Sequence, residues 1–108
     1  MSGVFSDREK AFEDKWAHDE DLRFKVLARR NKLLGLWAAT EMGLKGQAAE
    51  DYAGAIVQAE LSRDGDEAVF QKLKADFAAA RIARTDHLIH LKMDELFNMA
   101  KNEVIHGG

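Results

Sequence analysis

Apolar residues recur at spacings of three and four along most of the chain, a pattern typical of helices that bury one face. Between residues 22 and 40 this stripe consists of Val26, Leu27, Leu33, Leu34 and Trp37. Ser6 and Glu9 have the spacing of a capping box, so the pattern predicts a helix over residues 7–42 that ends at Gly43. At 1.5 Å per residue this helix would be about 54 Å long, and we expect its first part to project, bend or fray.

Three shorter helices follow, and their ends are marked by glycines and polar residues because the chain contains no proline. The first covers about residues 47–61 and is weakened by Gly54. The next starts at Asp64 or at Asp66, and the last follows an interruption at residues 84–86. Four helices with short connections predict an all-α fold, a four-helix bundle with a long N-terminal helix or a mobile N-terminal arm.

Charge divides the first forty residues into an acidic and a basic segment. Residues 6–21 carry seven acidic and three basic side chains, a net charge of −4, whereas residues 22–40 carry five basic side chains and no acidic one. Packing within one bundle does not require such a division, which suggests that the two segments face different partners. We therefore divide the chain into an N-terminal arm, residues 1–21, and a helical bundle, residues 22–108.

The acidic arm also carries an aromatic seam, because Phe12 and Trp16 each fall within about 20° of Phe5 on a helical wheel. Two interpretations fit these rings. They cover the core of the bundle, or the arm folds as a helix into a groove on a larger partner. Ten of the sixteen residues from 6 to 21 are charged, which leaves little apolar area to hold the arm on its own domain and favours the partner.

Two arginines of the basic segment, Arg23 and Arg30, fall inside the apolar stripe, at the helical phase of Leu27 and Leu34. The other basic side chains lie opposite the stripe and are expected in solvent: Lys25, Arg29 and Lys32. A buried guanidinium without a partner is costly, so the two arginines in the stripe need partners.

Two kinds of partner are compatible with these arginines. In the first case the partner is structural: a carboxylate on a neighbouring helix, such as Asp76 or Asp86, or water that the side chains reach by extending past the core. The other is an anionic ligand such as a nucleotide phosphate, with Asn31 supplying amide hydrogen bonds and Trp37 a stacking plane.

The composition excludes several classes of function. Without cysteine the chain has no disulfide and no thiolate chemistry, and a reducing cytoplasm is the simplest compartment. A net charge of −3 argues against nucleic-acid binding. No apolar run approaches the roughly 20 residues that span a bilayer, and the acidic start lacks the apolar centre of a signal peptide, so we expect neither membrane insertion nor export by that route.

No catalytic or metal-binding motif is recognisable. The chain has no glycine-rich phosphate-binding loop. His87 and His90 share a helix face without an evident third ligand, and Glu103 with His106 forms one Glu-x-x-His motif where a di-iron bundle needs two. We therefore expect a protein that is not an enzyme, with no metal and no required cofactor.

Three stretches resemble one known family: SDREKAFEDKWAHDEDLRFKVLARRNKLLGLWAA, GDEAVFQKLKADFAAA and TDHLIHLKMDEL. They are similar to the ζ subunits of alphaproteobacterial F-type ATP synthases, small inhibitors of the F1-ATPase, over about residues 6–103. The resemblance implies a four-helix bundle whose N-terminal segment enters an α/β catalytic interface of F1 near the γ subunit and blocks rotation in the hydrolysis direction. It also implies a cytoplasmic protein, peripheral at the inner membrane through F1.

Carried over to this chain, the inhibitory segment is residues 2–19. Six of its positions are expected to contact the α, β and γ subunits of F1: Phe5, Arg8, Glu9, Phe12, Lys15 and Trp16. The family is also described as binding ADP or ATP on the bundle with a conformational response, and from the helical wheel we place that site at Arg23, Arg30, Asn31 and Trp37. The first hypothesis is therefore a regulatory inhibitor, and the alternative is an ADP- or ATP-binding sensor whose nucleotide site controls the arm.

Overall fold

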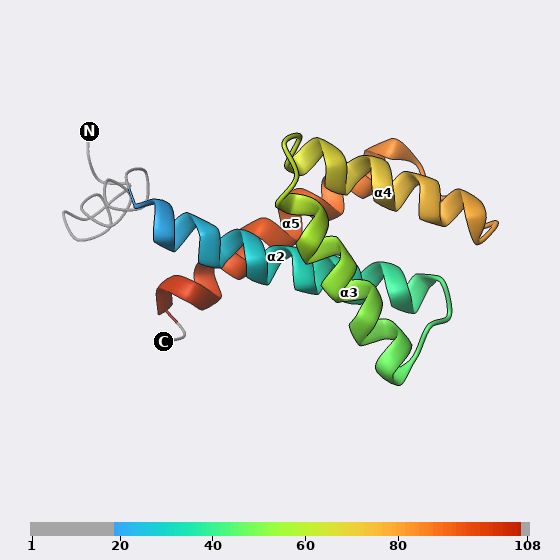
Figure 1. Ribbon diagram of the computed structural model, residues 1–108, viewed down its shortest axis with the longest axis horizontal. Helices are drawn as coiled ribbons and strands as arrows, with labels where there is room; N and C mark the ends of the chain where they lie inside the picture. The colour runs from blue at the N-terminus through green and yellow to red at the C-terminus, as the bar shows by residue number, and fades with distance from the viewer. Residues whose placement is uncertain (1–18, 107–108) are drawn as a thin grey trace, which may run out of the picture.

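The structure, a computed structural model, describes residues 19–106. These residues form four helices (Figure 1). The helices are α2 (Glu20–Glu41), α3 (Gly46–Glu60), α4 (Asp66–Ala79) and α5 (Asp86–His106). No strand occurs within residues 19–106, and the predicted all-α bundle is confirmed.

The start of α2 differs from the prediction. Asp19 is extended, with φ −102° and ψ 99°, and its side chain accepts a hydrogen bond from the backbone N–H of Leu22 at 3.0 Å. An N-cap of this kind satisfies one of the amides that a helix start leaves unpaired. An unbroken helix over residues 7–42 is therefore wrong, because Asp19, which lies inside that range, is extended and not helical. The predicted capping box of Ser6 and Glu9 lies outside the described residues.

The other helix ends follow local chemistry. Gly43 ends α2 as predicted, and its φ of 80° lies in the left-handed region that glycine enters without a Cβ penalty. Of the two predicted starts for α4, Asp66 is the observed one, and Asp64 contributes only its carbonyl oxygen, which accepts from the N–H of Glu67 at 3.0 Å. Thr85 precedes α5, and its hydroxyl accepts from the N–H of Leu88 at 3.0 Å.

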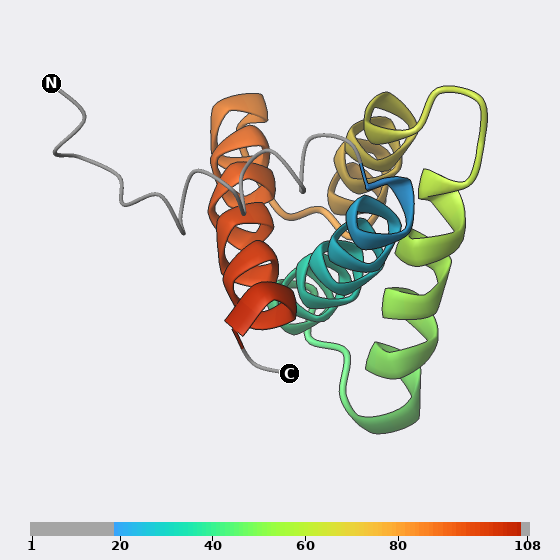
Figure 2. The same ribbon diagram turned by 90° about the vertical axis from the view of Figure 1, so that its left-hand side faces the viewer.

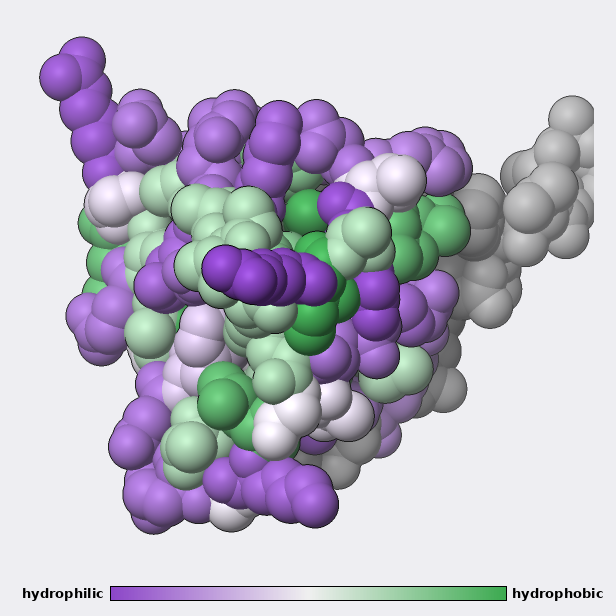
Figure 3. Space-filling model, turned by 90° about the vertical axis from the view of Figure 1, so that its right-hand side faces the viewer, coloured by the Kyte–Doolittle hydropathy of each residue, from purple (hydrophilic) through white to green (hydrophobic). Residues whose placement is uncertain are grey.

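Helix α2 is the centre of the bundle. It packs against both α3 and α5, which lie on opposite sides of it (Figure 2), and α4 packs against α3 and α5. The core between them is aliphatic and aromatic, with large side chains that are completely or almost completely buried: Leu34, Ile56, Leu73, Phe77 and Ile89. Figure 3 shows the surface at the end of the bundle farthest from the start of α2, where hydrophilic residues surround smaller groups of apolar residues.

Helices α2 and α3 approach each other closely at Gly35. A Cβ atom added there would lie 2.6 Å from the Cα of Ala53 on α3, a distance that real Cβ contacts do not show. The absence of a side chain at Gly35 therefore allows the backbones of α2 and α3 to meet, which fixes the position of the following α3 residues relative to the buried face of α2.

Candidate functional site

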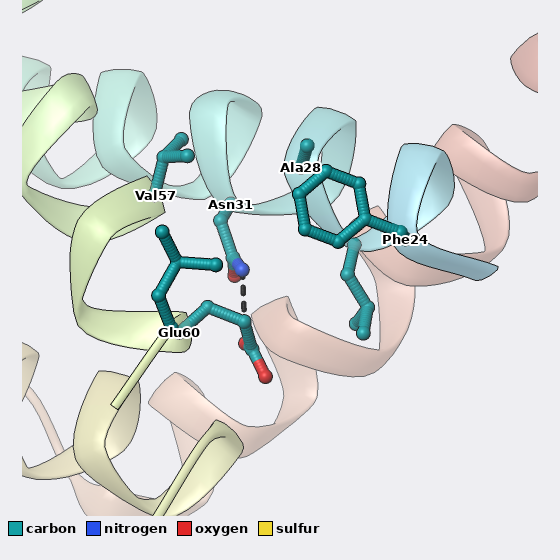
Figure 4. A pocket seen from close by; sticks show the side chains of 7 residues that line it. Phe24, Ala28, Asn31, Val57 and Glu60 are labelled. Atoms are coloured by element: carbon teal, nitrogen blue, oxygen red, sulfur yellow. Dashed lines mark hydrogen bonds between the residues drawn. The ribbon is translucent and has the colours of Figure 1, made fainter. Parts of the chain in front are cut away.

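A buried arginine joins three helices near the middle of α2. Arg30 is only 2% exposed, and its Nε donates to Oδ1 of Asn31 at 2.7 Å. Its Nη2 donates to Oε1 of Glu60 on α3 at 3.0 Å and to Oδ1 of Asp66 on α4 at 2.5 Å. Nδ2 of Asn31 donates to the same Glu60 oxygen at 2.9 Å, and the two side chains point toward each other across the helix interface (Figure 4). We call these four residues the Arg30 cluster.

The cluster confirms that Arg30 is buried and paired, but the predicted carboxylate partners were wrong. Asp76 accepts instead from the hydroxyl of Tyr52 at 2.7 Å, and Asp86 pairs with Lys74 at 3.2 Å. The observed partners, Glu60 and Asp66, are the last residue of α3 and the first of α4. A connection of five residues brings these two positions together, which is the sequence signal that would have identified them.

Two carboxylates share one guanidinium in this cluster, and their pKa values move in opposite directions. Burial raises the pKa of Glu60, and the adjacent Asp66 raises it further, against the hydrogen bond from Asn31 and the charge of Arg30. Burial also acts to raise the pKa of Asp66, but hydrogen bonds with Glu60 and Arg30 outweigh it and hold that pKa below its usual value. As the pH falls, Glu60 is therefore the first of the two to bind a proton.

Only two of the four residues assigned to a nucleotide site lie together. Arg30 and Asn31 are neighbours in the cluster, where their side chains bind each other and Glu60. The ring of Trp37 packs edge-on against Phe77, with ring centres 5.6 Å apart, and Nζ of Lys92 lies 5.8 Å from its centre. The proposed stacking plane is therefore in contact with α4 and α5.

Arg23 is exposed, although the helical wheel placed it in the buried stripe. The reason is tertiary, because the first turns of α2 project past the ends of α3 and α4 (Figure 1), so this part of the stripe is not covered by them. Arg23 and Trp37 are also fourteen positions apart, or about 21 Å along a helix. A nucleotide site formed by all four residues stays a prediction.

The opposite face of α2 is as predicted. Lys25, Arg29 and Lys32 are exposed, and Nε of Arg29 binds Oε2 of Glu103 on α5 at 2.6 Å. Both members of this pair are more than 40% exposed, so it is a surface contact.

A pocket of about 150 Å³ adjoins the Arg30 cluster between α2 and α3. It was not predicted from the sequence. Apolar side chains form most of its lining, together with the two cluster members Asn31 and Glu60 (Figure 4). The remaining residues that line this α2–α3 pocket are Phe24, Leu27, Ala28, Val57 and Leu61.

Comparison with protein families decides the assignment. The sequence model of one family, described as ATPase inhibitor subunit zeta, matches residues 1–103. The chain belongs to the zeta inhibitor family. The match includes the N-terminal segment, α2, α3, α4 and α5 as far as Glu103, and it confirms the resemblance found in the sequence. A comparison with curated proteins gave no match.

Membership assigns this zeta chain the role of an ATPase inhibitor, a regulatory protein that associates with the F1 part of the ATP synthase. The six residues predicted to contact F1 all lie outside the described residues: Phe5, Arg8, Glu9, Phe12, Lys15 and Trp16. The segment that carries them joins the bundle at Asp19, the N-cap of α2.

Several residues considered for metal binding have structural contacts in this zeta chain. The ring of His90 stacks on Phe70 with ring centres 4.1 Å apart, and Glu103 accepts from Arg29. Among residues 19–106 no group of three or more histidine or acidic side chains is arranged to hold a metal ion. None of the helices α2 to α5 is long and apolar enough to cross a membrane.

Proposed function

We propose that this zeta chain inhibits ATP hydrolysis by inserting its N-terminal segment at an α/β catalytic interface of F1, close to the γ subunit, where it blocks rotation in the hydrolysis direction. The observation that carries the proposal is the family match over residues 1–103, which includes the N-terminal segment. In the bound state the aromatic seam of Phe5, Phe12 and Trp16 is buried against F1. The bundle stays outside F1, and the protein is cytoplasmic and peripheral at the inner membrane through F1.

The contacts of the Arg30 cluster bear on the choice between the inhibitor and the nucleotide sensor. Within the bundle, Arg30 binds Asn31, Glu60 and Asp66, and Asn31 also binds Glu60, so the cluster joins α2, α3 and α4. These contacts give a structural role to two of the residues that the alternative hypothesis assigns to a nucleotide, and inhibition is therefore the better supported function.

Deletion of residues 1–18 tests the proposal, because it keeps Asp19 and hence the cap of α2. We expect the truncated chain to lose inhibition of ATP hydrolysis by the cognate F1, measured as turnover against inhibitor concentration. An unchanged thermal unfolding midpoint would show that the bundle is intact. If the truncated chain inhibits as well as the full one, the segment is not the inhibitory element.

A matched pair of substitutions refines this experiment. Trp16→Asp places a charge on the aromatic seam, whereas Ala17→Asp adds the same charge about 100° away on the helical wheel. We expect inhibition to weaken strongly for Trp16→Asp and little for Ala17→Asp. Equal effects would contradict burial of the seam in F1.

A further inference from the structure

Two large apolar side chains remain exposed at one pocket. Phe24 is 59% exposed and Leu61 is 57% exposed, and both line the α2–α3 pocket although they are far apart in the sequence. The ring of Phe24 and the methyl groups of Leu61 belong to an apolar lining, which also includes the polar side chains of Asn31 and Glu60. Figure 4 shows Phe24, Asn31 and Glu60 around the pocket. Exposed apolar residues that converge on a concave surface mark binding sites more often than scattered ones do.

The size and chemistry of the pocket define what it can hold. A cavity of about 150 Å³ with an apolar lining accommodates a group the size of benzene. The polar groups of Asn31 and Glu60 in this lining already bind each other at 2.9 Å. The pocket therefore suits an aromatic or branched aliphatic side chain better than a charged ligand.

The position of the pocket connects it to the N-terminal segment. Residues 1–18 join the bundle at Asp19, and Phe24 follows five residues later, about 7.5 Å along α2. Any protein that receives residues 1–18 must present its own surface close to the first turns of α2. These turns project past α3 and α4 (Figure 1), and Phe24 on them is exposed.

We propose that the α2–α3 pocket is a second contact site for the ATPase, occupied by an aromatic or branched aliphatic side chain of the enzyme when residues 1–18 are inserted. The inference rests on the proposed function and adds a surface on the bundle to it. When one of two binding elements on a chain is bound, the effective concentration of the other at its own site is raised. The bundle therefore increases the affinity, while the N-terminal segment causes the inhibition.

The test uses full-length chains and uncharged substitutions. Phe24→Gln with Leu61→Gln removes two apolar side chains from the lining, and Leu91→Gln with Met99→Gln is the control, because these residues of α5 are about half exposed and do not line the pocket. We expect the first pair to raise the half-inhibitory concentration at least tenfold, the effect of losing an interface anchor, with complete inhibition still reached at saturation. The control pair should leave this concentration within about twofold.

The outcomes separate the two proposals. If the unmodified chain does not inhibit, the proposed function fails. If it inhibits and both double variants have the same half-inhibitory concentration, only the second contact site fails. Thermal unfolding of each variant checks the fold, and the single substitution Phe24→Gln, expected to give an intermediate shift, serves if the double variant unfolds.

Two other occupants would also overturn the inference. A dimer of the free chain that light scattering detects and Phe24→Gln dissolves would assign the pocket to a second copy. Loss of amide protection at Phe24 and Leu61 on deletion of residues 1–18, in the absence of the ATPase, would assign it to the chain's own N-terminal segment. A monomer with unchanged protection supports the ATPase as the occupant.

Discussion

Replacing Arg30 by methionine tests how the bundle is held together. Methionine keeps an unbranched stem but lacks the guanidinium that binds Asn31, Glu60 and Asp66. Removal of one partner from a buried ion pair costs about 3–5 kcal/mol, because the other charge stays buried without compensation.

The exposure of the partners refines this magnitude. The side chain of Asp66 is 60% exposed and can turn to water, whereas that of Glu60 is 15% exposed and Asn31 is completely buried. The loss therefore comes mainly from Glu60 and Asn31, and we expect the lower end of the range, about 3 kcal/mol. Since a small domain has about 5–15 kcal/mol of stability in total, this is a large fraction.

Urea unfolding followed by far-ultraviolet circular dichroism measures the effect. The midpoint should fall with an unchanged slope, which indicates a change in stability and not in the surface exposed on unfolding. The neighbouring Arg29→Met is the control, because its pair with Glu103 is exposed and is worth about 0–1 kcal/mol. A loss below about 1 kcal/mol for Arg30→Met, or equal losses for both arginines, would refute the reasoning.

A double variant separates the ion pair from simple packing. In Arg30→Met combined with Glu60→Gln, no buried carboxylate is left without its cation, and the amide oxygen introduced at position 60 can still accept from Nδ2 of Asn31. We expect the double variant to be more stable than Arg30→Met alone, because the uncompensated buried charge that makes the single substitution costly is removed. If the two losses add instead, the residues are not energetically coupled.

Two further predictions concern Glu60 and the contact of α2 with α3. The raised pKa of Glu60 means that the folded chain binds this proton more tightly than the unfolded chain does. The free energy of unfolding should therefore increase as the pH falls from neutral toward the ordinary value near 4.5. In urea unfolding at several pH values, Glu60→Gln should reduce this increase, and an unchanged dependence on pH would contradict the prediction. Gly35→Ala should lower the free energy of unfolding by about 1–3 kcal/mol, because the new Cβ would be forced against Ala53. Gly54→Ala, which has open space around it, should raise the free energy of unfolding by about 0.5–1 kcal/mol. Equal melting temperatures of the two variants would contradict both predictions.

The helices could be predicted from the sequence because their signals are local. Gly43 ends α2 through its own backbone freedom, and the stripes of α3 to α5 follow from spacing alone. The start of α2 was missed because Asp19 is one of three consecutive acidic residues, and nothing in the periodicity distinguishes a capping carboxylate from one on a helix surface.

The site was predicted only as far as one helix determines it. The wheel of α2 gives Arg23 and Arg30 almost the same phase, yet one is exposed and the other buried, because cover by α3 and α4 depends on how the helices are placed along one another. The same limitation led to the wrong carboxylates. The position on the helical wheel shows which side chains face inward. How far two helices are shifted along their axes decides which of these side chains contact each other.

The α2–α3 pocket had no sequence signal for a similar reason. Leu61 caps the C-terminal end of α3, and Phe24 is exposed in the first turns of α2, so neither belongs to the buried stripe of its helix. Only the packing of α2 on α3, with Gly35 against Ala53, brings these two exposed side chains to the same pocket.

The Arg30 cluster and the pocket are connected through two shared residues. Asn31 and Glu60 form hydrogen bonds in the cluster and also line the pocket. The ion pairs of Arg30 therefore fix the polar part of a pocket whose lining is otherwise apolar, and a pocket held in shape before binding needs little ordering when an apolar side chain enters. It follows that loss of Arg30 should weaken any binding at the pocket even though the arginine itself does not line it, since the position of Glu60 depends on that guanidinium.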